Sequence, residues 1–302
     1  MVSFQGLRLQ TTRNATRSFG LLLAVMTALL LLMLVALGSV QAVHKPHSTE
    51  CSSLVVFGDG FSDDGAEVSR QSHGFMRNSN GPVWAEYLNK DLECGEYQNY
   101  AYSGAKSGID NFYFGNWSGV LWQVKTFLSR NLVLSNDVLV VLQTGGLIDM
   151  FSGEKSTETI LDGIEEAVNL LASDVNSGTL LLLNLPDVSS APGLNTIEQS
   201  DELKKTMLDM TSAINQKLRW MLIEKEAVLT DRRSNLKLKL FDLNDSIVNS
   251  MKNLNITRPF TYQNENTQAH DVHRYGYFDL WHPTSRVHYE VARKIRIFLE
   301  DQ

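Results

Sequence analysis

The sequence predicts one α/β domain, a three-layer sandwich in which a central parallel sheet is flanked by helices. Short apolar runs recur along residues 51–302, and longer segments with apolar residues at helical spacing separate them. No internal repeat, low-complexity tract or Pro/Gly-rich linker divides this part of the chain. Regular alternation of strand and helix is typical of parallel sheets with helices on both faces.

The predicted strands are short runs rich in leucine and β-branched residues. They are residues 54–57, 98–101, 138–144, 180–185 and 238–242. The predicted helices carry apolar residues three or four positions apart, which places those side chains on one face. The three clearest stripes are Ile160, Ile164, Val168 and Leu171; Leu203, Met207, Met210, Ile214, Leu218 and Met221; and Val287, Val291, Ile295 and Phe298. We interpret all three as core.

Composition limits the partners of this domain. The chain has 302 residues, is 43% hydrophobic and carries a formal charge of −7. Three of its basic residues, Arg8, Arg13 and Arg17, precede the first apolar block, so the remainder is more acidic still. An acidic surface repels phosphate backbones, and we therefore expect no nucleic-acid partner.

The N-terminal 42 residues are predicted to be a targeting segment, with the domain at residues 43–302. An uncharged apolar block follows the three arginines, and small residues at positions 40–42 suit signal cleavage. The alternative is a signal anchor, because the roughly 19 apolar residues 19–37 are enough to span a bilayer. Both interpretations leave the domain secreted, or anchored on the luminal or extracellular side.

Features of the domain agree with a secretory route. Sequons begin at Asn116, Asn244 and Asn255, which are candidate glycosylation sites. The two cysteines, Cys51 and Cys94, are predicted to pair in an oxidising compartment, although two separate thiols are the alternative. The pairing would contribute about 4 kcal/mol of stability on the chain-entropy model.

Distinctive turns follow the predicted strands. They lie at residues 57–60, 102–105 and 145–149, and a fourth segment at 279–284 precedes the last helix. Ligands bind beyond the carboxyl ends of the strands in open parallel sheets. We therefore expect these four segments to form one site.

Several of these motifs together resemble the GDSL, or SGNH, family of esterases and lipases. They include "NGPVWAEYL" at residues 80–88, "NYAYSGA" at 99–105 and "DLWHPT" at 279–284. The resemblance covers residues 51–302 and implies the flavodoxin-like SGNH-hydrolase fold. It implies that His282 is the general base, that Asp279 orients it, and that Gly104 donates a backbone N–H to the oxyanion.

The chain departs from the family pattern at two positions. The nucleophilic serine of the family falls on Gly60, which has no hydroxyl. The asparagine of the third block falls on Ile148, or on Leu147 if the gap is shifted by one residue. The predicted oxyanion hole is thus Gly60 and Gly104, with Ile148 at the asparagine position. Loss of one such donor typically costs about 10² to 10³ in rate.

Two functions remain open. One is a pseudoenzyme that binds a small-molecule ester, a lipid or an acylated glycan in the inherited cleft. The other is an active ester hydrolase that uses His282 and Asp279 with a non-standard nucleophile or an activated water. Ser62 lies two positions from the expected nucleophile, and Ser103 is no better placed.

No cofactor or metal is expected. The chain contains no phosphate-binding glycine motif, and the H-D-x-H run at residues 270–273 has no third ligand nearby in sequence. Tyr113, Phe114 and Trp117 form an aromatic cluster after the second predicted strand. These side chains either pack against the core or line a cleft for a sugar or acyl group.

Overall fold

The computed structural model describes residues 51–301 except 66–72, 75, 133, 135, 199, 233 and 262–267. The predicted targeting segment, including the apolar block, lies outside the described residues. Among the helices of the described part, none is long and apolar enough to cross a membrane.

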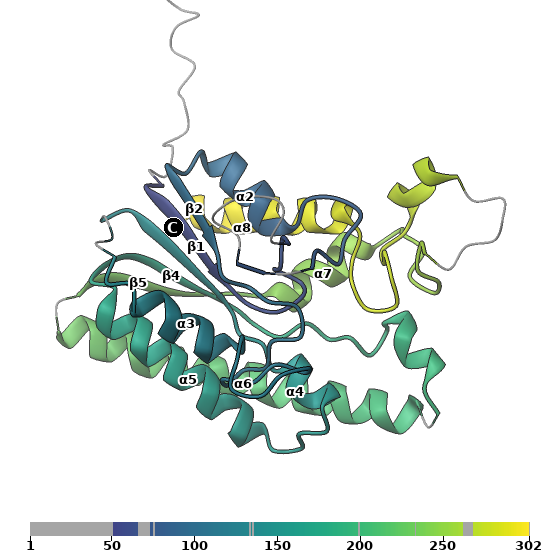
Figure 1. Cartoon of the computed structure of the whole chain (residues 1–302), viewed down its shortest axis with the longest axis horizontal. Coiled ribbons are helices and arrows are strands. Elements are labelled where there is room, and N and C mark those ends of the chain that lie inside the picture. Colours follow the sequence, from purple (N-terminus) through teal and green to yellow (C-terminus); the bar gives the residue numbers. More distant parts are fainter. Residues whose placement is uncertain are drawn as a thin grey trace, which may run out of the picture. The chain divides into compact units, whose positions relative to one another are not determined.

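Five strands form one parallel sheet (Figure 1), in the order β2-β1-β3-β4-β5. They are β1 (Ser53–Phe57), β2 (Glu96–Asn99), β3 (Val138–Gln143), β4 (Ser177–Leu183) and β5 (Asn235–Phe241). The chain runs from β1 outward to β2 and then returns to place β3 on the other side of β1. The carboxyl ends of β1 and β3 are therefore a topological switch point, where open α/β sheets bind ligands.

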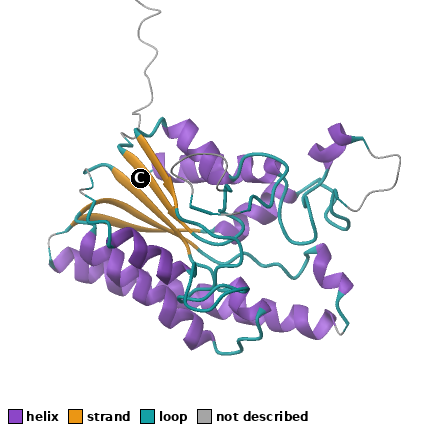
Figure 2. Cartoon of the chain, in the orientation of Figure 1, coloured by secondary structure: helices purple, strands orange, loops and turns teal. Residues whose placement is uncertain are grey.

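Helices cover both faces of the sheet (Figure 2), which confirms the predicted three-layer architecture. One face packs against α3 (Val120–Leu128), α5 (Thr157–Asp174) and α6 (Ser200–Asp231). The other face packs against α2 (Trp84–Leu92), α7 (Leu243–Met251) and α8 (Ser285–Glu300). The described part of the chain also contains three short helical elements: α4 (Leu147–Phe151) and the 3₁₀ helices η1 (Pro192–Thr196) and η2 (Ala269–Arg274).

Alternate residues of each central strand enter the two cores. In β1, Val55 and Phe57 pack on the α3, α5 and α6 side, whereas Leu54 and Val56 pack on the other side. All four side chains are fully buried. A strand that is apolar on both faces forms a nearly continuous hydrophobic run in the sequence. For this reason the predicted strands 54–57 and 138–144 lie within one residue of the bounds of β1 and β3.

The edge strand β2 begins two residues earlier than predicted and ends two residues earlier. Its first residue, Glu96, pairs with Ser53 of β1 and is exposed, so the apolar pattern does not include it. Beyond the strand, the side chain of Asn99 accepts a hydrogen bond from the N–H of Ala101 at 3.0 Å. Backbone pairing with the β1 segment continues past Asn99, because the N–H groups of Tyr100 and Tyr102 donate to the carbonyls of Val56 and Gly58 at 2.8 and 3.1 Å.

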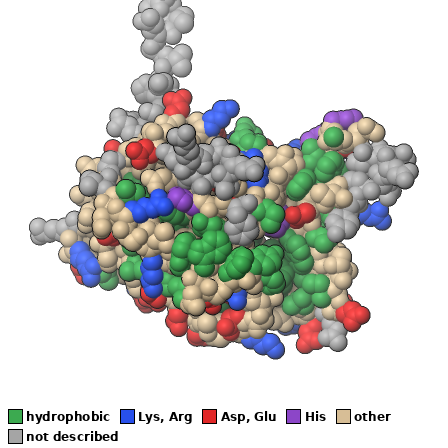
Figure 3. Space-filling view, in the orientation of Figure 1, with side chains coloured by type: hydrophobic (Ala, Val, Ile, Leu, Met, Phe, Trp, Pro, Cys, Tyr) green, Lys and Arg blue, Asp and Glu red, His purple; other side chains and the backbone are tan. Residues whose placement is uncertain are grey.

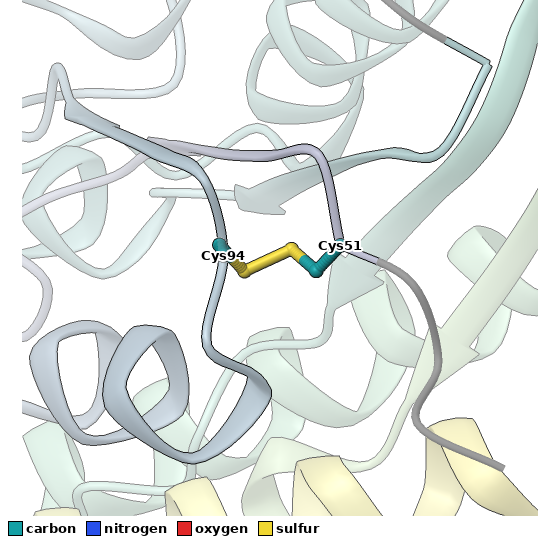
Figure 4. The surroundings of a disulfide bond; sticks show 2 residues. All are labelled: Cys51 and Cys94. Atoms are coloured by element: carbon teal, nitrogen blue, oxygen red, sulfur yellow. A yellow bond between two sulfur atoms is a disulfide. The ribbon is translucent and has the colours of Figure 1, made fainter.

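A disulfide joins the amino-terminal ends of the first two strands (Figure 4). It links Cys51, which precedes β1, to Cys94, which precedes β2, with an S–S distance of 2.01 Å. The backbone N–H of Gly95 also donates to the carbonyl of Cys51 at 3.1 Å. The structure therefore has the paired arrangement and not the two separate thiols.

Removal of this disulfide should lower the free energy of unfolding by about 4 kcal/mol, because the cross-link restricts the unfolded chain. Urea unfolding of a Cys51→Ser/Cys94→Ser variant measures the change. A reductant should lower the free energy of unfolding of the wild-type protein by the same amount. The same reductant should not change the free energy of unfolding of the variant. A loss below about 1 kcal/mol would show that the bridge adds little to stability.

Candidate active site

The turn after β1 is held by two buried glutamines. The N–H of Gly58 donates to Oε1 of Gln123 at 2.9 Å, and the N–H of Asp59 donates to Oε1 of Gln143 at 3.1 Å. Asp59 in turn accepts from the N–H of Phe61 at 2.9 Å. These bonds fix the backbone on both sides of Gly60.

A side chain at Gly60 would point at the imidazole of His282. A Cβ built on Gly60 lies 2.9 Å from Nε2 of His282, 3.0 Å from Nδ2 of Asn78 and 3.1 Å from Oγ of Ser103. Three polar atoms thus surround the place where a nucleophile would begin. Gly60 does not have a positive φ, so a residue with a side chain can adopt its backbone conformation.

His282 and Asp279 form an oriented pair on a tight turn. Nδ1 of His282 lies 2.9 Å and 3.0 Å from the two carboxylate oxygens of Asp279. The N–H groups of Trp281 and His282 donate to the same carboxylate at 2.8 and 2.7 Å. The turn is closed by a hydrogen bond of 2.8 Å from the N–H of Phe278 to the carbonyl of His282.

The charge of Asp279 fixes the tautomer of His282. Burial alone raises the pKa of the Asp279 carboxyl, but the hydrogen bond and charge of His282 and the two backbone N–H groups outweigh it. The pKa of Asp279 therefore lies below its ordinary value, and the group is a carboxylate at neutral pH. A carboxylate accepts the Nδ1 proton, which leaves Nε2 free to accept a proton as a general base.

A second histidine lies behind the turn and has no such role. The ring of His288 stacks on Phe61 at 4.6 Å, and its Nδ1 accepts from the N–H of Trp84 at 3.3 Å. Complete burial, with smaller effects from the charges of His282 and Arg77, lowers the pKa of His288 to about 3. His288 is therefore a neutral core residue.

Gly104, the predicted second oxyanion donor, has a backbone conformation that requires glycine. It adopts a φ of +82°, and an added Cβ would lie 2.8 Å from Oδ1 of Asn111. A side chain is thus excluded on both conformational and steric grounds. Within the described part of the chain, no acceptor is bonded to the N–H of Gly60 or of Gly104. Both glycines line one cavity together with His282.

Ile148 lines the same cavity from the first turn of α4. The next residue, Asp149, anchors the helix, because its carboxylate accepts from the N–H and the hydroxyl of Ser107 at 2.8 and 3.0 Å. Leu147 also lines the cavity. Neither of the two positions proposed for the family asparagine, Ile148 and Leu147, supplies a side-chain amide.

Asn78 is a site residue that the sequence did not reveal. Its Nδ2 donates to Oγ of Ser103 at 2.8 Å and lies beside the space next to Gly60. Asn78 therefore brings a side-chain amide to the site from a different part of the chain. No local pattern marks it, because its approach depends on how the segment before α2 packs against the turn after β2.

The two nearby serines have different surroundings. Oγ of Ser62 is buried, donates to Oε1 of Gln143 at 2.7 Å and accepts from Nε1 of Trp84 at 3.0 Å. Ser62 is outside the cavity lining and is no candidate nucleophile. Ser103 lines the cavity, and its hydroxyl accepts from Asn78.

The cavity at this edge of the sheet measures about 340 Å³ and is lined mainly by apolar side chains. Such dimensions are typical of a site for a small organic ligand. The apolar walls come from Phe112, Leu147, Ile148, Phe151, Val188, Ile247, Met251 and Trp281. Trp281 packs edge-on against Phe151 with ring centroids 4.8 Å apart.

The remaining predicted residues lie at the surface or beside the cavity. Asn116 and Asn255 are exposed, whereas Asn244 is half-buried and its Oδ1 accepts from the N–H of Asp187 at 2.7 Å. His270 and Asp271 stand 3.9 Å apart. The described residues include no cluster of three or more metal-ligating side chains.

Comparison with known proteins identifies relatives of this arrangement. The family model described as GDSL-like Lipase/Acylhydrolase matches residues 54–295. An inhibitor-bound M. smegmatis aryl esterase is 14% identical, with 83% of this chain and 99% of that chain covered and a TM-score of 0.47. A putative GDSL-like lipase from Parabacteroides merdae is 12% identical, with coverages of 81% and 94% and a TM-score of 0.43. No curated protein matches the chain.

Proposed function

The chain belongs to the GDSL-like lipase/acylhydrolase family of ester hydrolases, and we propose that it is a catalytically impaired member that binds an acyl ligand. One observation carries the proposal. A Cβ added at position 60 would lie 2.9 Å from Nε2 of His282, the predicted general base, but the glycine there presents only a hydrogen atom. An acyl-enzyme needs an attacking oxygen, and a glycine has none.

The rest of the site favours binding over turnover. His282 and the N–H groups of Gly60 and Gly104 are able to hold a carbonyl, and the apolar cavity suits the hydrocarbon part of an ester or lipid. Ile148 replaces the amide that would stabilise an oxyanion. The groups that can hold an ester are thus retained, whereas the site has fewer groups that would stabilise the transition state.

Hydrolysis by an activated water is the second candidate, because the Asp279–His282 pair is intact and Asn78 and Ser103 add polar atoms beside Gly60. In this mechanism Nε2 of His282 removes a proton from water as the water oxygen attacks the ester carbonyl. The ester oxygen then leaves as an alcohol after it accepts the proton back from His282. No acyl-enzyme forms, because the water oxygen adds to the carbonyl carbon in place of a protein side chain.

Turnover of p-nitrophenyl acetate and butyrate separates the two candidates. The impaired-enzyme proposal expects the same rate from the wild-type protein and from His282→Ala. A His282-dependent rate would instead favour an active hydrolase, which uses either an activated water or a non-standard nucleophile. Decanoate should raise the melting temperature of both proteins, because a ligand that binds only the folded state stabilises it. Ile148→Glu, which places a carboxylate in the cavity, should abolish this shift, and a shift that persists would place the ligand elsewhere.

We also propose that the domain functions outside the cytosol, secreted or anchored by residues 19–37. The charged and apolar leader supports this, and so does the disulfide, since disulfides persist in oxidising compartments. Asn255 is the favoured glycan acceptor because it is exposed and its sequon ends in threonine. Asn244 is disfavoured because its side chain holds the backbone of Asp187.

A further inference from the structure

A loop beyond β2 presents four large aromatic side chains to solvent. Their exposed fractions are 51% for Phe112, 63% for Tyr113, 52% for Phe114 and 36% for Trp117. We call residues 109–117 the aromatic loop. Of the predicted aromatic cluster, Tyr113 lines the cavity, Phe114 is exposed without lining it, and Trp117 packs against Tyr102 and Trp122 with ring centroids 5.3 and 6.1 Å apart.

The loop is held in place by backbone hydrogen bonds. The N–H of Phe112 donates to the carbonyl of Gly104 at 2.7 Å, and the N–H of Asn111 donates to the carbonyl of Phe114 at 2.8 Å. Asn116 and Ser118 have positive φ angles of 54° and 58°, which are uncommon outside glycine. The fold thus maintains an unfavourable backbone in the segment that exposes the rings.

The exposed rings form one continuous patch. The ring centroids are 5.1 Å apart for Phe112 and Tyr113, 6.3 Å for Tyr113 and Phe114, and 5.3 Å for Phe114 and Trp117. Figure 3 shows hydrophobic side chains gathered over the loops at the carboxyl edge of the sheet. A contiguous apolar patch of this kind usually marks an interaction site.

The patch is continuous with the apolar cavity. Phe112 and Tyr113 belong to the patch and also line the cavity, whose lining includes Ile247 and Met251. A hydrocarbon chain is therefore able to pass from the patch to the cavity along apolar side chains. This continuity points to a partner that contains acyl chains.

The chemistry of the loop favours hydrocarbon over sugar. Residues 112–117 carry no charge, and the two phenylalanines have no hydrogen-bonding group for hydroxyls. Tyrosine and tryptophan combine an apolar ring with a polar edge, which suits the boundary between lipid and water. The formal charge of −7 disfavours attraction of the chain to anionic lipids.

We propose that the aromatic loop docks the domain on a zwitterionic lipid surface, with the cavity mouth toward the lipid. Docking depends only on the loop, whereas passage of an acyl chain into the cavity rests on the proposed function. A glycan at Asn116 would stand among the rings and keep them from the lipid. The docking proposal therefore requires that Asn116 be free of glycan in the secreted protein.

Sedimentation with phosphatidylcholine vesicles tests the docking. The mature protein collected from the medium of secreting cells should bind at 0.15 M salt, and the same binding should persist at 0.5 M salt. Phe112→Ser/Phe114→Ser should lower the partition coefficient at least about tenfold. The matched control is Trp220→Ser/Ile223→Ser, which removes side chains of α6 that are 62% and 56% exposed. This control should bind like the wild type.

Several results would overturn the docking proposal. One is that the wild-type protein does not bind the vesicles, or that the aromatic-loop variant binds them as well as the wild type does. Another is that the α6 control loses as much binding as the aromatic-loop variant. The last two are binding that requires anionic lipid and is abolished by salt, and a glycan at Asn116. Binding to insoluble xylan that the loop variant loses, without vesicle binding, would assign the loop to polysaccharide. The decanoate shift is measured on every variant. Because Phe112 also lines the cavity, the folding of each variant is shown by its cooperative thermal transition without ligand. Absence of the decanoate shift from the wild type would contradict the cavity ligand without bearing on docking.

Discussion

Gly60→Ser should hydrolyse p-nitrophenyl butyrate at least about 10²-fold faster than the wild-type protein, because the substitution supplies the missing nucleophile. The Cβ position lies 2.9 Å from Nε2 of His282, so the new hydroxyl begins beside its base. The imidazole must shift by a few tenths of an ångström, and its contacting atom is the end of a side chain. The backbone at Gly60 already suits a residue with a side chain.

Two controls show whether the gain is serine chemistry. Gly60→Ala fills the same space without an oxygen and should remain at the wild-type rate. Gly60→Ser combined with His282→Ala should lose the gain, since the hydroxyl then has no base. If Gly60→Ser is folded and as inactive as Gly60→Ala, position 60 is not the nucleophile position.

Ile148→Asn should raise kcat by about a further 10²-fold in the Gly60→Ser background, because it restores a side-chain donor to the oxyanion. In the wild-type background the same substitution should change little, since no acyl-enzyme chemistry generates an oxyanion there. The two effects should therefore be strongly non-additive. Steady-state kinetics of the two single variants and the double variant measure this coupling.

Two matched substitutions in the Gly60→Ser background control for volume and register. Ile148→Leu changes shape without adding an amide and should give no gain. Leu147→Asn places the amide one residue earlier in α4, where the shifted gap would require it. A gain from Leu147→Asn but not from Ile148→Asn would show that the family asparagine corresponds to position 147.

The predictable parts of this protein are those that local sequence determines. Strands β1 and β3 are buried on both faces and read as unbroken apolar runs, whereas the exposed start of β2 at Glu96 gives no such signal. Asp279 and His282 lie three residues apart, so one turn brings them together. Their pairing follows from the motif.

The contacts that the sequence did not predict join distant segments. Asn78 meets Ser103 because the segment before α2 packs against the turn after β2. Ser62 lies only two positions from the expected nucleophile in sequence, yet its hydroxyl is bonded to Gln143 and Trp84 in the core. The exposure of the aromatic loop could not be predicted from the apolar residue types, which are compatible with burial or exposure; its backbone is bonded within residues 111–114 and to Gly104.

Intact-mass spectrometry after treatment with a fluorophosphonate tests the central claim most directly, because the probe adds to an activated serine. The wild-type protein should show no adduct. Gly60→Ser should gain one adduct that maps to position 60 and disappears when His282→Ala is added. A stoichiometric, His282-dependent adduct on the wild-type protein, at Ser103 or any other serine, would contradict the account.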